Sequence, residues 1–340
     1  MGAGLPSFVP PLFQDAAFYA DFTRCGAQDV GEAILIGGTG RNSFTFSRAS
    51  QATYFNAQGV LTTAANNQPR FAFDPVTLVP QGVLIEEQRT NSFLNSGSPA
   101  SQTVTVTNSA TWTISFYGTG SISYAGAATG TLNGTGNFPT RVSVTVTTSS
   151  TSLVLTLSGS VTSPQVELGS FPTSYIPTSG SAVTRASEYF ALDTLINAKI
   201  GSTNAPRTQY CNFIGGGFNS GIMVYELSGG SGNGNATLYS GFLGLWNGAN
   251  YFAANAPAPY VANAEYKVAD SYFSTGRLGV AQNVPVSSTP LTANGDGYLS
   301  QTNSNFLQLG YNQSQITIKK FAYWNKQMTA AELQQITSAA

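Results

Sequence analysis

The chain has 340 residues, enough for two domains or for one domain with insertions. Only 9% of the residues are charged, against about 25% in a typical soluble protein. Fourteen Lys and Arg nearly balance fifteen Asp and Glu, and there is no histidine. A nucleic-acid-binding protein needs a basic face, so we expect no nucleic-acid partner. Because histidine is absent, we expect no Ser-His or Cys-His nucleophile and no His-ligated metal. We also expect no other metal and no cofactor.

The two cysteines, Cys25 and Cys211, could form one disulfide or remain free buried thiols, and nothing in the sequence indicates an oxidising compartment. No apolar run reaches the roughly 20 residues that a membrane helix needs. The first six residues lack the basic n-region of a signal peptide. These features predict a soluble protein that is made in a cytoplasm, has no secretion signal and does not contact a membrane.

Strict alternation of apolar and polar residues marks the first half of the chain. Such a pattern places one face of a strand in a core and the other in water. The alternating runs are Thr103 to Thr107, Thr111 to Tyr117, Arg141 to Thr147 and Leu153 to Leu157. Glycine- and asparagine-rich turns separate them, so they predict an antiparallel β-sandwich.

A second region of predicted strands begins near Ser187. Its runs are Ile222 to Leu227, Leu238 to Trp246, Tyr272 to Val280, Phe306 to Tyr311 and Ile316 to Trp324. One helix is predicted after them, because Thr329 and Glu332 form a capping box and Leu333 and Ile336 share a face. We expect this short C-terminal helix to pack on the second sandwich.

The N-terminal segment alternates prolines with large apolar residues. Its apolar side chains are Phe8, Val9, Leu12 and Phe13. Because proline opposes both helix and sheet, this arm needs another surface to pack on. Two alternatives remain: a tail that packs on its own domain, or an anchor in a larger assembly.

Two short segments carry carboxylates and amides that are candidate catalytic or binding groups. Glu86 and Glu87 are neighbours, so on a strand they point to opposite faces and cannot flank one glycosidic bond. We expect one to be solvated and the other to pair with an arginine such as Arg89. Gln165 and Glu167 share a strand face, where they could bind a hydroxylated ligand or a neighbouring loop. With no local carboxylate pair, the sequence favours a non-enzyme.

Aromatic residues make up 12% of the chain, and Trp and Tyr faces on β-sandwiches can stack on sugar rings. The most ligand-like group is Trp246, Asn247, Asn250 and Tyr251. It places two aromatic rings and two amides around one turn, which predicts a carbohydrate site, with a core or subunit-interface role as the alternative. Trp112 and Trp324 lie within alternating runs and are expected in cores.

A series of short motifs then follows in order along the chain. It comprises Phe46-Ser47-Arg48-Ala49-Ser50, Gly59-Val60-Leu61, Pro69-Arg70-Phe71, Gly82-Val83-Leu84-Ile85-Glu86, Arg89-Thr90-Asn91, Gln165-Val166-Glu167-Leu168-Gly169, Thr173-Ser174-Tyr175-Ile176-Pro177-Thr178 and Val183-Thr184-Arg185-Ala186. This series, over residues 44–188, resembles virion proteins of tailed bacteriophages and prophages, which often carry jelly-roll-like carbohydrate-binding modules. The C-terminal part is similar, more weakly, to concanavalin A-like (laminin G-type) sandwiches of the same kind of protein.

The resemblance implies an all-β chain of two antiparallel sandwiches with an N-terminal extended arm and a C-terminal helix. We place the arm in residues 1–25, a jelly-roll, carbohydrate-binding-module-like sandwich in 26–186 and a concanavalin A-like sandwich in 187–340. The motif residues are expected to be structural, as turns, arginine–carboxylate pairs and strand crossings.

The function that the resemblance implies is that of a virion fibre, spike or decoration subunit that contacts host-surface polysaccharide. Its partners would be other virion proteins, held through the arm, and further copies of itself, a trimer by analogy. A head-decoration or tail-scaffold protein without a ligand is the alternative. A polysaccharide depolymerase would need two convergent carboxylates, or a Tyr or Lys base.

Overall fold

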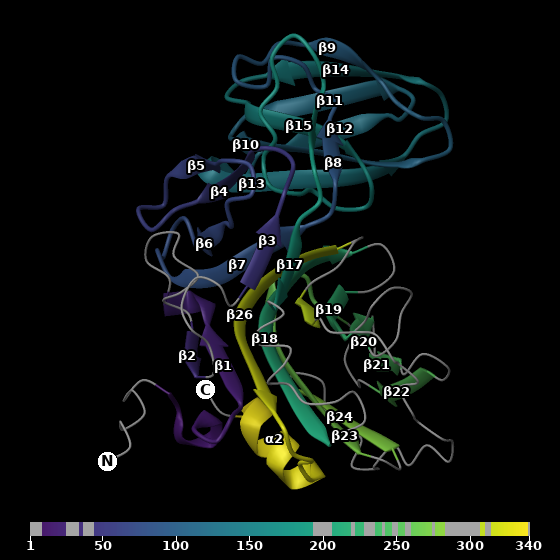
Figure 1. The fold of residues 1–340 in the computed structure, drawn as a ribbon. Helices are drawn as coiled ribbons and strands as arrows, with labels where there is room; N and C mark the ends of the chain where they lie inside the picture. The colour runs from purple at the N-terminus through teal and green to yellow at the C-terminus, as the bar shows by residue number, and fades with distance from the viewer. Residues whose placement is uncertain are drawn as a thin grey trace.

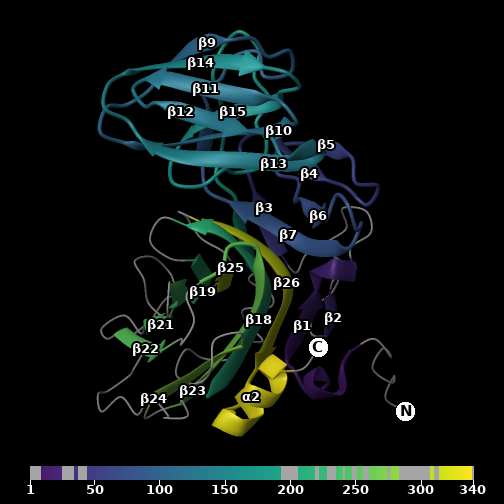
Figure 2. The ribbon, with the colours of Figure 1, turned by 180° about the vertical axis from the view of Figure 1, so that it is seen from behind.

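In the computed structural model the chain is an all-β fold of two stacked antiparallel sandwiches with one C-terminal helix (Figures 1 and 2). The structure describes residues 9–24, 34–36, 44–192, 206–218, 222–227, 235–239, 242–246, 251–255, 260–273, 276–282, 307–309 and 314–338. The strands and antiparallel sheets in these ranges confirm the predicted all-β fold class. No helix in these ranges is long and apolar enough to span a membrane.

The upper sandwich, at the top of Figure 1, comprises strands β9 to β15 in two facing sheets. One sheet has the order β13 (Gly136–Thr147), β10 (Thr111–Gly118), β15 (Thr162–Leu168). The other has the order β12 (Gly130–Asn133), β11 (Ser121–Gly126), β14 (Ser152–Ser158), β9 (Gln102–Thr105). Three of the four alternating runs predicted in this region lie entirely on these strands, and the run from Thr103 to Thr107 overlaps β9 and extends two residues past its end.

Strand β10 is buried on both of its faces. Its apolar side chains Trp112, Ile114 and Phe116 belong to the core that the two sheets enclose, together with Leu153 of β14. The prediction that Trp112 is a core residue is confirmed. The polar face of β10 is covered too, and it ends at Tyr117, which is buried on the side toward the lower sandwich.

The lower sandwich contains a sheet of eight described strands that curves through the centre of Figure 1. Its main path is β2 (Ile34–Ile36), β1 (Phe18–Asp21), β26 (Ser314–Trp324), β18 (Arg207–Phe218), β23 (Ala264–Phe273), β24 (Gly276–Gln282). Strand β7 (Pro80–Glu86) also pairs with β26 and carries β6 (Phe71–Phe73) at its other edge.

A second sheet lies opposite the lower part of the first (Figure 2). Its order is β22 (Tyr251–Asn255), β21 (Phe242–Trp246), β20 (Asn235–Tyr239), β19 (Ile222–Leu227), β25 (Leu307–Leu309), β17 (Tyr189–Leu192), β3 (Phe44–Ser47). The described residues also form two separate strand pairs: β4 (Ala52–Phe55) with β5 (Leu61–Ala64), and β8 (Arg89–Asn91) with β16 (Val183–Arg185).

Two of the predicted strands are in fact hairpins. The run from Leu238 to Trp246 spans the end of β20 and all of β21, which pair antiparallel. The run from Tyr272 to Val280 spans the end of β23 and much of β24, which also pair. Each run is apolar on both sides of the reversal, so the sequence pattern does not mark where one strand ends and the next begins.

The N-terminal segment packs into the lower sandwich. After a short 3-10 helix, η1 (Pro11–Phe13), strand β1 pairs with β26, and a second 3-10 helix, η2 (Phe22–Arg24), follows it. Val9 and Phe13 are buried against Trp324, and Leu12 packs at the edge of the same cluster. The structure thus supports the packed-tail alternative and leaves Val9 and Phe13 no free surface for anchoring. Phe8 lies outside the described residues.

The C-terminal helix α2 (Ala330–Ser338) begins at the predicted capping box. The Thr329 N–H donates to Glu332 Oε2 at 2.7 Å, and the Glu332 N–H donates back to Thr329 Oγ1 at 3.3 Å. Leu333 and Ile336 are buried in the cluster around Trp324, which closes the outer face of the eight-stranded sheet. The predictions for this helix and for Trp324 are confirmed.

The chain crosses between the sandwiches twice, from β7 into β8 and from β16 back into β17. The lower sandwich therefore draws strands from both ends of the chain, and the upper sandwich is inserted between them. For example, Phe18 is the register partner of Tyr323, and Ile85 is that of Ile316. The structure thus joins segments that the predicted boundaries at residues 25 and 186 separate.

Candidate functional site

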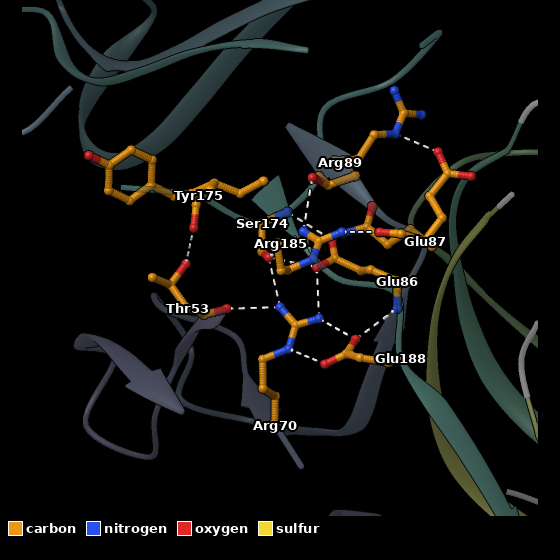
Figure 3. A network of polar contacts seen from close by, with 12 residues as sticks. Thr53, Arg70, Glu86, Glu87, Arg89, Ser174, Tyr175, Arg185 and Glu188 are labelled. Atoms are coloured by element: carbon orange, nitrogen blue, oxygen red, sulfur yellow. Dashed lines mark hydrogen bonds and ion pairs between the residues drawn. The ribbon is translucent and has the colours of Figure 1, made fainter. Parts of the chain in front are cut away.

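The two crossings run side by side and carry a buried network of charged side chains (Figure 3). Strands β8 and β16 pair with Arg89 opposite Arg185. Four arginines and four glutamates are buried in this region, eight of the 29 charged residues of the chain. They are Arg48, Arg70, Arg89, Arg185, Glu86, Glu87, Glu167 and Glu188. Equal numbers of each sign allow every buried charge to have a partner, which burial of an ion requires.

Arg70 is the centre of the network. Its Nη2 lies 2.5 Å from Glu188 Oε2 and 2.8 Å from Glu86 Oε2, and its Nη1 donates to the Thr53 carbonyl at 2.9 Å. Glu188 also binds Arg48 Nη1 at 2.7 Å. These contacts join β4 and β7 to the residues next to β3, β6 and β17, at the point where the upper sandwich joins the lower one. The expectation that motif arginines pair with carboxylates is confirmed.

Glu86 is fully enclosed at the end of β7. Burial alone would raise its pKa, but the guanidinium groups of Arg185 and Arg70 and hydrogen bonds from Ser174 lower the pKa to about 2. Neither Glu86 nor Glu87 is solvated: Glu86 is 1% exposed, and the buried Glu87 receives the Arg89 Nε–H at 2.5 Å. The pairing of Glu87 with Arg89 was predicted, whereas the prediction of one solvated glutamate is wrong.

The low pKa of Glu86 predicts a loss of stability in acid. Its folded pKa of about 2 lies below the ordinary 4.5, so its contribution is complete above pH 4.5 and is lost as the pH falls toward 2. Relative to Glu86→Gln, we expect wild type to lose about 2 kcal/mol more unfolding free energy between about pH 5 and about pH 3. Urea titrations at both pH values measure this difference, and equal losses in the two proteins would contradict it.

Gln165 and Glu167 share a face of β15, as predicted, and both are buried. Glu167 accepts hydrogen bonds from the backbone and hydroxyl of Thr173, at 3.1 and 2.5 Å. Gln165 Oε1 accepts from the Ile176 N–H at 2.6 Å. Of their two possible roles, the structure shows the structural one, because they hold the loop after β15.

A cleft of about 380 Å³ opens beside the network, where the upper and lower sandwiches meet. This volume is within the range of about 300–1,000 Å³ that is typical of small-ligand sites. Its lining combines aromatic rings with amides and contains two charged residues. Its lining includes Phe55, Asp74, Gln81, Tyr117, Arg141, Ser174, Asn263 and Gln315.

The floor of the cleft rests on the network. Ser174 and Gln315 line the cleft, and both hold the buried Glu86 beneath it. The Ser174 hydroxyl donates to Glu86 Oε2 at 2.6 Å, and Gln315 Nε2 donates to Glu86 Oε1 at 2.8 Å. The ion pairs thus fix the polar groups that a ligand in the cleft would meet.

Aromatic rings continue from the cleft to the outside. The Phe138 ring lies 5.8 Å from that of Phe55 and 5.2 Å from that of Tyr117, centroid to centroid. Phe55 and Tyr117 line the cleft, while Phe138 is 45% exposed at its rim. The Arg141 guanidinium lies over the Tyr117 ring at 5.4 Å and is held by Ser115 Oγ at 2.8 Å. The inner part of this wall is therefore held by contacts within the protein, and its outer end at Phe138 is exposed.

The predicted carbohydrate site lies on the other sheet of the lower sandwich, outside the cleft. Trp246 ends β21 and Tyr251 begins β22, and the two residues are register partners in this hairpin. Asn247 and Asn250 lie outside the described residues, as does Cys25. Cys211 is a free, fully buried thiol, and burial raises its pKa. Among the residues that the structure describes, no cluster of His, Cys, Asp or Glu could hold a metal ion.

The sequence matches no protein-family model and no curated protein. Several solved structures match 40–45% of the chain, and glycans are named as ligands of three of them. The CBM40 module of a Ruminococcus gnavus IT-sialidase, bound to α2,3-sialyllactose, is 12% identical over 40% of this chain and 84% of its own, with a TM-score of 0.34.

Two further neighbours are botulinum neurotoxin type C and the leech intramolecular trans-sialidase. The neurotoxin, whose cell entry depends on two ganglioside molecules, is 11% identical over 44% of this chain and 39% of its own, with a TM-score of 0.33. The leech enzyme is 15% identical over 41% of this chain and 24% of its own, with a TM-score of 0.33. These identities and scores are too low to transfer a fold family, a ligand or an activity to this chain.

Proposed function

We propose that this chain is a non-enzymatic glycan-contacting subunit of a tailed-phage virion, a fibre, spike or decoration protein. The observation that carries the glycan part is the cleft between the sandwiches, with its aromatic wall and its amide groups. Aromatic faces pack on the C–H groups of sugar rings, and amides donate to and accept from hydroxyls. The motif series over residues 44–188 supports the virion part, because it resembles proteins of that class.

The charges at the cleft favour binding over hydrolysis. Glycoside hydrolysis needs two carboxyl groups that reach the substrate, one of them protonated. The two glutamates that converge, Glu86 and Glu188, have fully buried side chains in ion pairs with Arg70. Glu86, with a pKa of about 2, holds no proton to donate at neutral pH. Asp74 is the only carboxylate among the described residues that line the cleft.

The hairpin of Trp246 and Tyr251 is proposed as a second glycan contact. The β21–β22 register makes these two residues direct cross-strand partners. If the hairpin contributes, Trp246→Ala and Tyr251→Ala weaken retention of polysaccharide independently of changes in the cleft. Unchanged retention in both variants would leave the cleft as the proposed contact.

A ligand-free decoration or scaffold role is the alternative. One observation favours it: exposed apolar side chains gather on the loops that flank β5 and β6, where they would suit a contact with another subunit. These side chains are Val60, Val76, Leu78 and Val79. Sedimentation of the purified chain tests the proposed trimer, and immunogold labelling of particles tests the virion location.

The test of glycan contact is to pass extracted envelope polysaccharides over the immobilised full-length protein and to measure retention and polymer length. We expect retention without shortening, and we expect Gln81→Ala combined with Asn263→Ala to abolish it. Gln335→Ala, which removes an exposed amide from helix α2, is the matched control and should retain polysaccharide as wild type does. Shortened polymer would contradict the non-enzymatic role, and no retention by wild type would favour the ligand-free alternative.

A further inference from the structure

The charges that line the cleft are few and already engaged. Only Asp74 and Arg141 are charged among the described lining residues. The Asp74 carboxylate accepts the backbone N–H groups of Thr77 and Val76, at 2.7 and 2.9 Å. The hydrogen bonds from Thr77 and Val76 lower the pKa of Asp74, and burial, which raises it, has a smaller effect than the bond from Thr77. The Asp74 carboxylate is therefore negative at neutral pH. The cleft therefore presents a fixed negative charge to a ligand.

The positive charge, on the Arg141 guanidinium, is bound by other groups of the protein. Arg141 Nη1 donates to the Thr173 carbonyl at 2.5 Å, Nη2 donates to Ser115 Oγ at 2.8 Å, and Nε is covered by protein. One face of its guanidinium lies over the Tyr117 ring. An acidic sugar in the cleft would thus meet Asp74 without a guanidinium fork facing it, and carboxylate recognition ordinarily relies on such a fork.

The remaining polar groups suit hydroxyls. Gln81 is half-buried and Asn263 is exposed, and each amide carries both a donor and an acceptor. Asn263 is held in the left-handed region, with φ of +64°, and its N–H donates to the Gly215 carbonyl at 2.6 Å. Its backbone is therefore fixed beside the cleft, which pre-organises the side chain for a ligand.

The aromatic row gives the ligand a direction. Phe55 and Tyr117 lie within the cleft, and Phe138 extends the row to a ring that is 45% exposed. A single sugar in the cleft would leave Phe138 unused, whereas a chain of several sugars would cover it. The Phe138 ring contacts those of Phe55 and Tyr117, so it belongs to the aromatic surface of the cleft and does not stand alone.

We propose that the cleft binds an uncharged oligosaccharide whose chain leaves across Phe138. This inference rests on the proposed glycan function, and it adds the chemical class and the path of the ligand. The contacts come from amides, from the Asp74 carboxylate and from ring faces, and none of them requires a charge on the sugar.

The test uses envelope polysaccharides separated by anion exchange into uncharged and acidic fractions, each presented to the full-length protein. We expect the uncharged fraction to be retained, equally at about 50 mM and about 500 mM NaCl, because screening does not weaken uncharged contacts. Retention of the acidic fraction, falling with salt and rising in Asp74→Asn, would overturn the proposal. If neither fraction is retained, the glycan function itself fails, and the inference fails with it.

The path is tested with oligosaccharides of increasing length cut from the retained polymer. Phe138→Ala should weaken binding of the longer ones roughly fivefold to tenfold and leave the shortest unchanged. Leu168→Ala is the matched control, because Leu168 is another exposed apolar residue, at 51%, and does not line the cleft. Equal affinities of the two variants for the longer oligosaccharides would overturn the path across Phe138.

Discussion

Replacing Arg70 with alanine is expected to lower the free energy of unfolding by about 3–5 kcal/mol. The guanidinium is fully buried and binds both Glu188 and Glu86, so its loss leaves two carboxylates without their shared partner in a site closed to water. Arg70→Lys keeps the charge but loses the planar fork, so we expect an intermediate loss. Urea denaturation of the three proteins measures the differences.

The control for this prediction is an ion pair at the surface. Lys326 and Asp15 form a salt bridge with side chains that are 44% and 60% exposed. Because such pairs contribute about 0–1 kcal/mol, Lys326→Ala should change stability little. If Arg70→Ala cost no more than Lys326→Ala, the network would not hold the sandwiches together as described.

Replacing Gly82 with alanine is the second change with a large expected effect. Strand β7 pairs with β26, and the two backbones lie so close at Gly82 that an added Cβ would be 2.1 Å from the Ile318 carbonyl oxygen. The φ of Gly82 is +112°, a region that residues with a side chain rarely adopt. Strain and overpacking together predict a loss of about 2–6 kcal/mol of unfolding free energy.

Gly180→Ala is the matched control, because nothing lies within 4 Å of the Cβ it would add. We expect its stability to stay within about 0.5 kcal/mol of wild type. Thermal or urea unfolding of both variants checks the prediction. A Gly82→Ala protein as stable as Gly180→Ala would show that β7 can move away from β26. The contact between these two strands would then not fix the floor of the cleft.

Local pattern predicts the strands well and their partners poorly. The alternation from Thr111 to Tyr117 identifies β10, and the capping box at Thr329 identifies α2. The pairing of Phe18 with Tyr323 leaves no trace in either segment, because a register partner 305 residues away imposes no local periodicity. For the same reason the N-terminal segment, with its prolines, is indistinguishable in sequence from a free arm.

The motif series indicates the supporting network but not the cleft. Arg70, Glu86 and Arg185 stand out as motif residues, and arginine–carboxylate pairing follows from their chemistry. The cleft is lined by residues as far apart as Tyr54 and Thr317, and each looks like an ordinary strand or loop residue by itself. Trp246 and Tyr251 stand out because they are close to each other in the sequence. A sequence pattern reveals such local groups more readily than groups that the fold brings together.

The most direct test of the cleft as the glycan site is hydrogen–deuterium exchange of the full-length protein with and without a retained oligosaccharide. We predict slower exchange in residues 72–84, 138–141 and 174–175, which form or flank the cleft, and unchanged exchange in the α2 helix. Protection confined to β21 and β22, around Trp246 and Tyr251, would contradict the assignment and place the glycan on the hairpin instead.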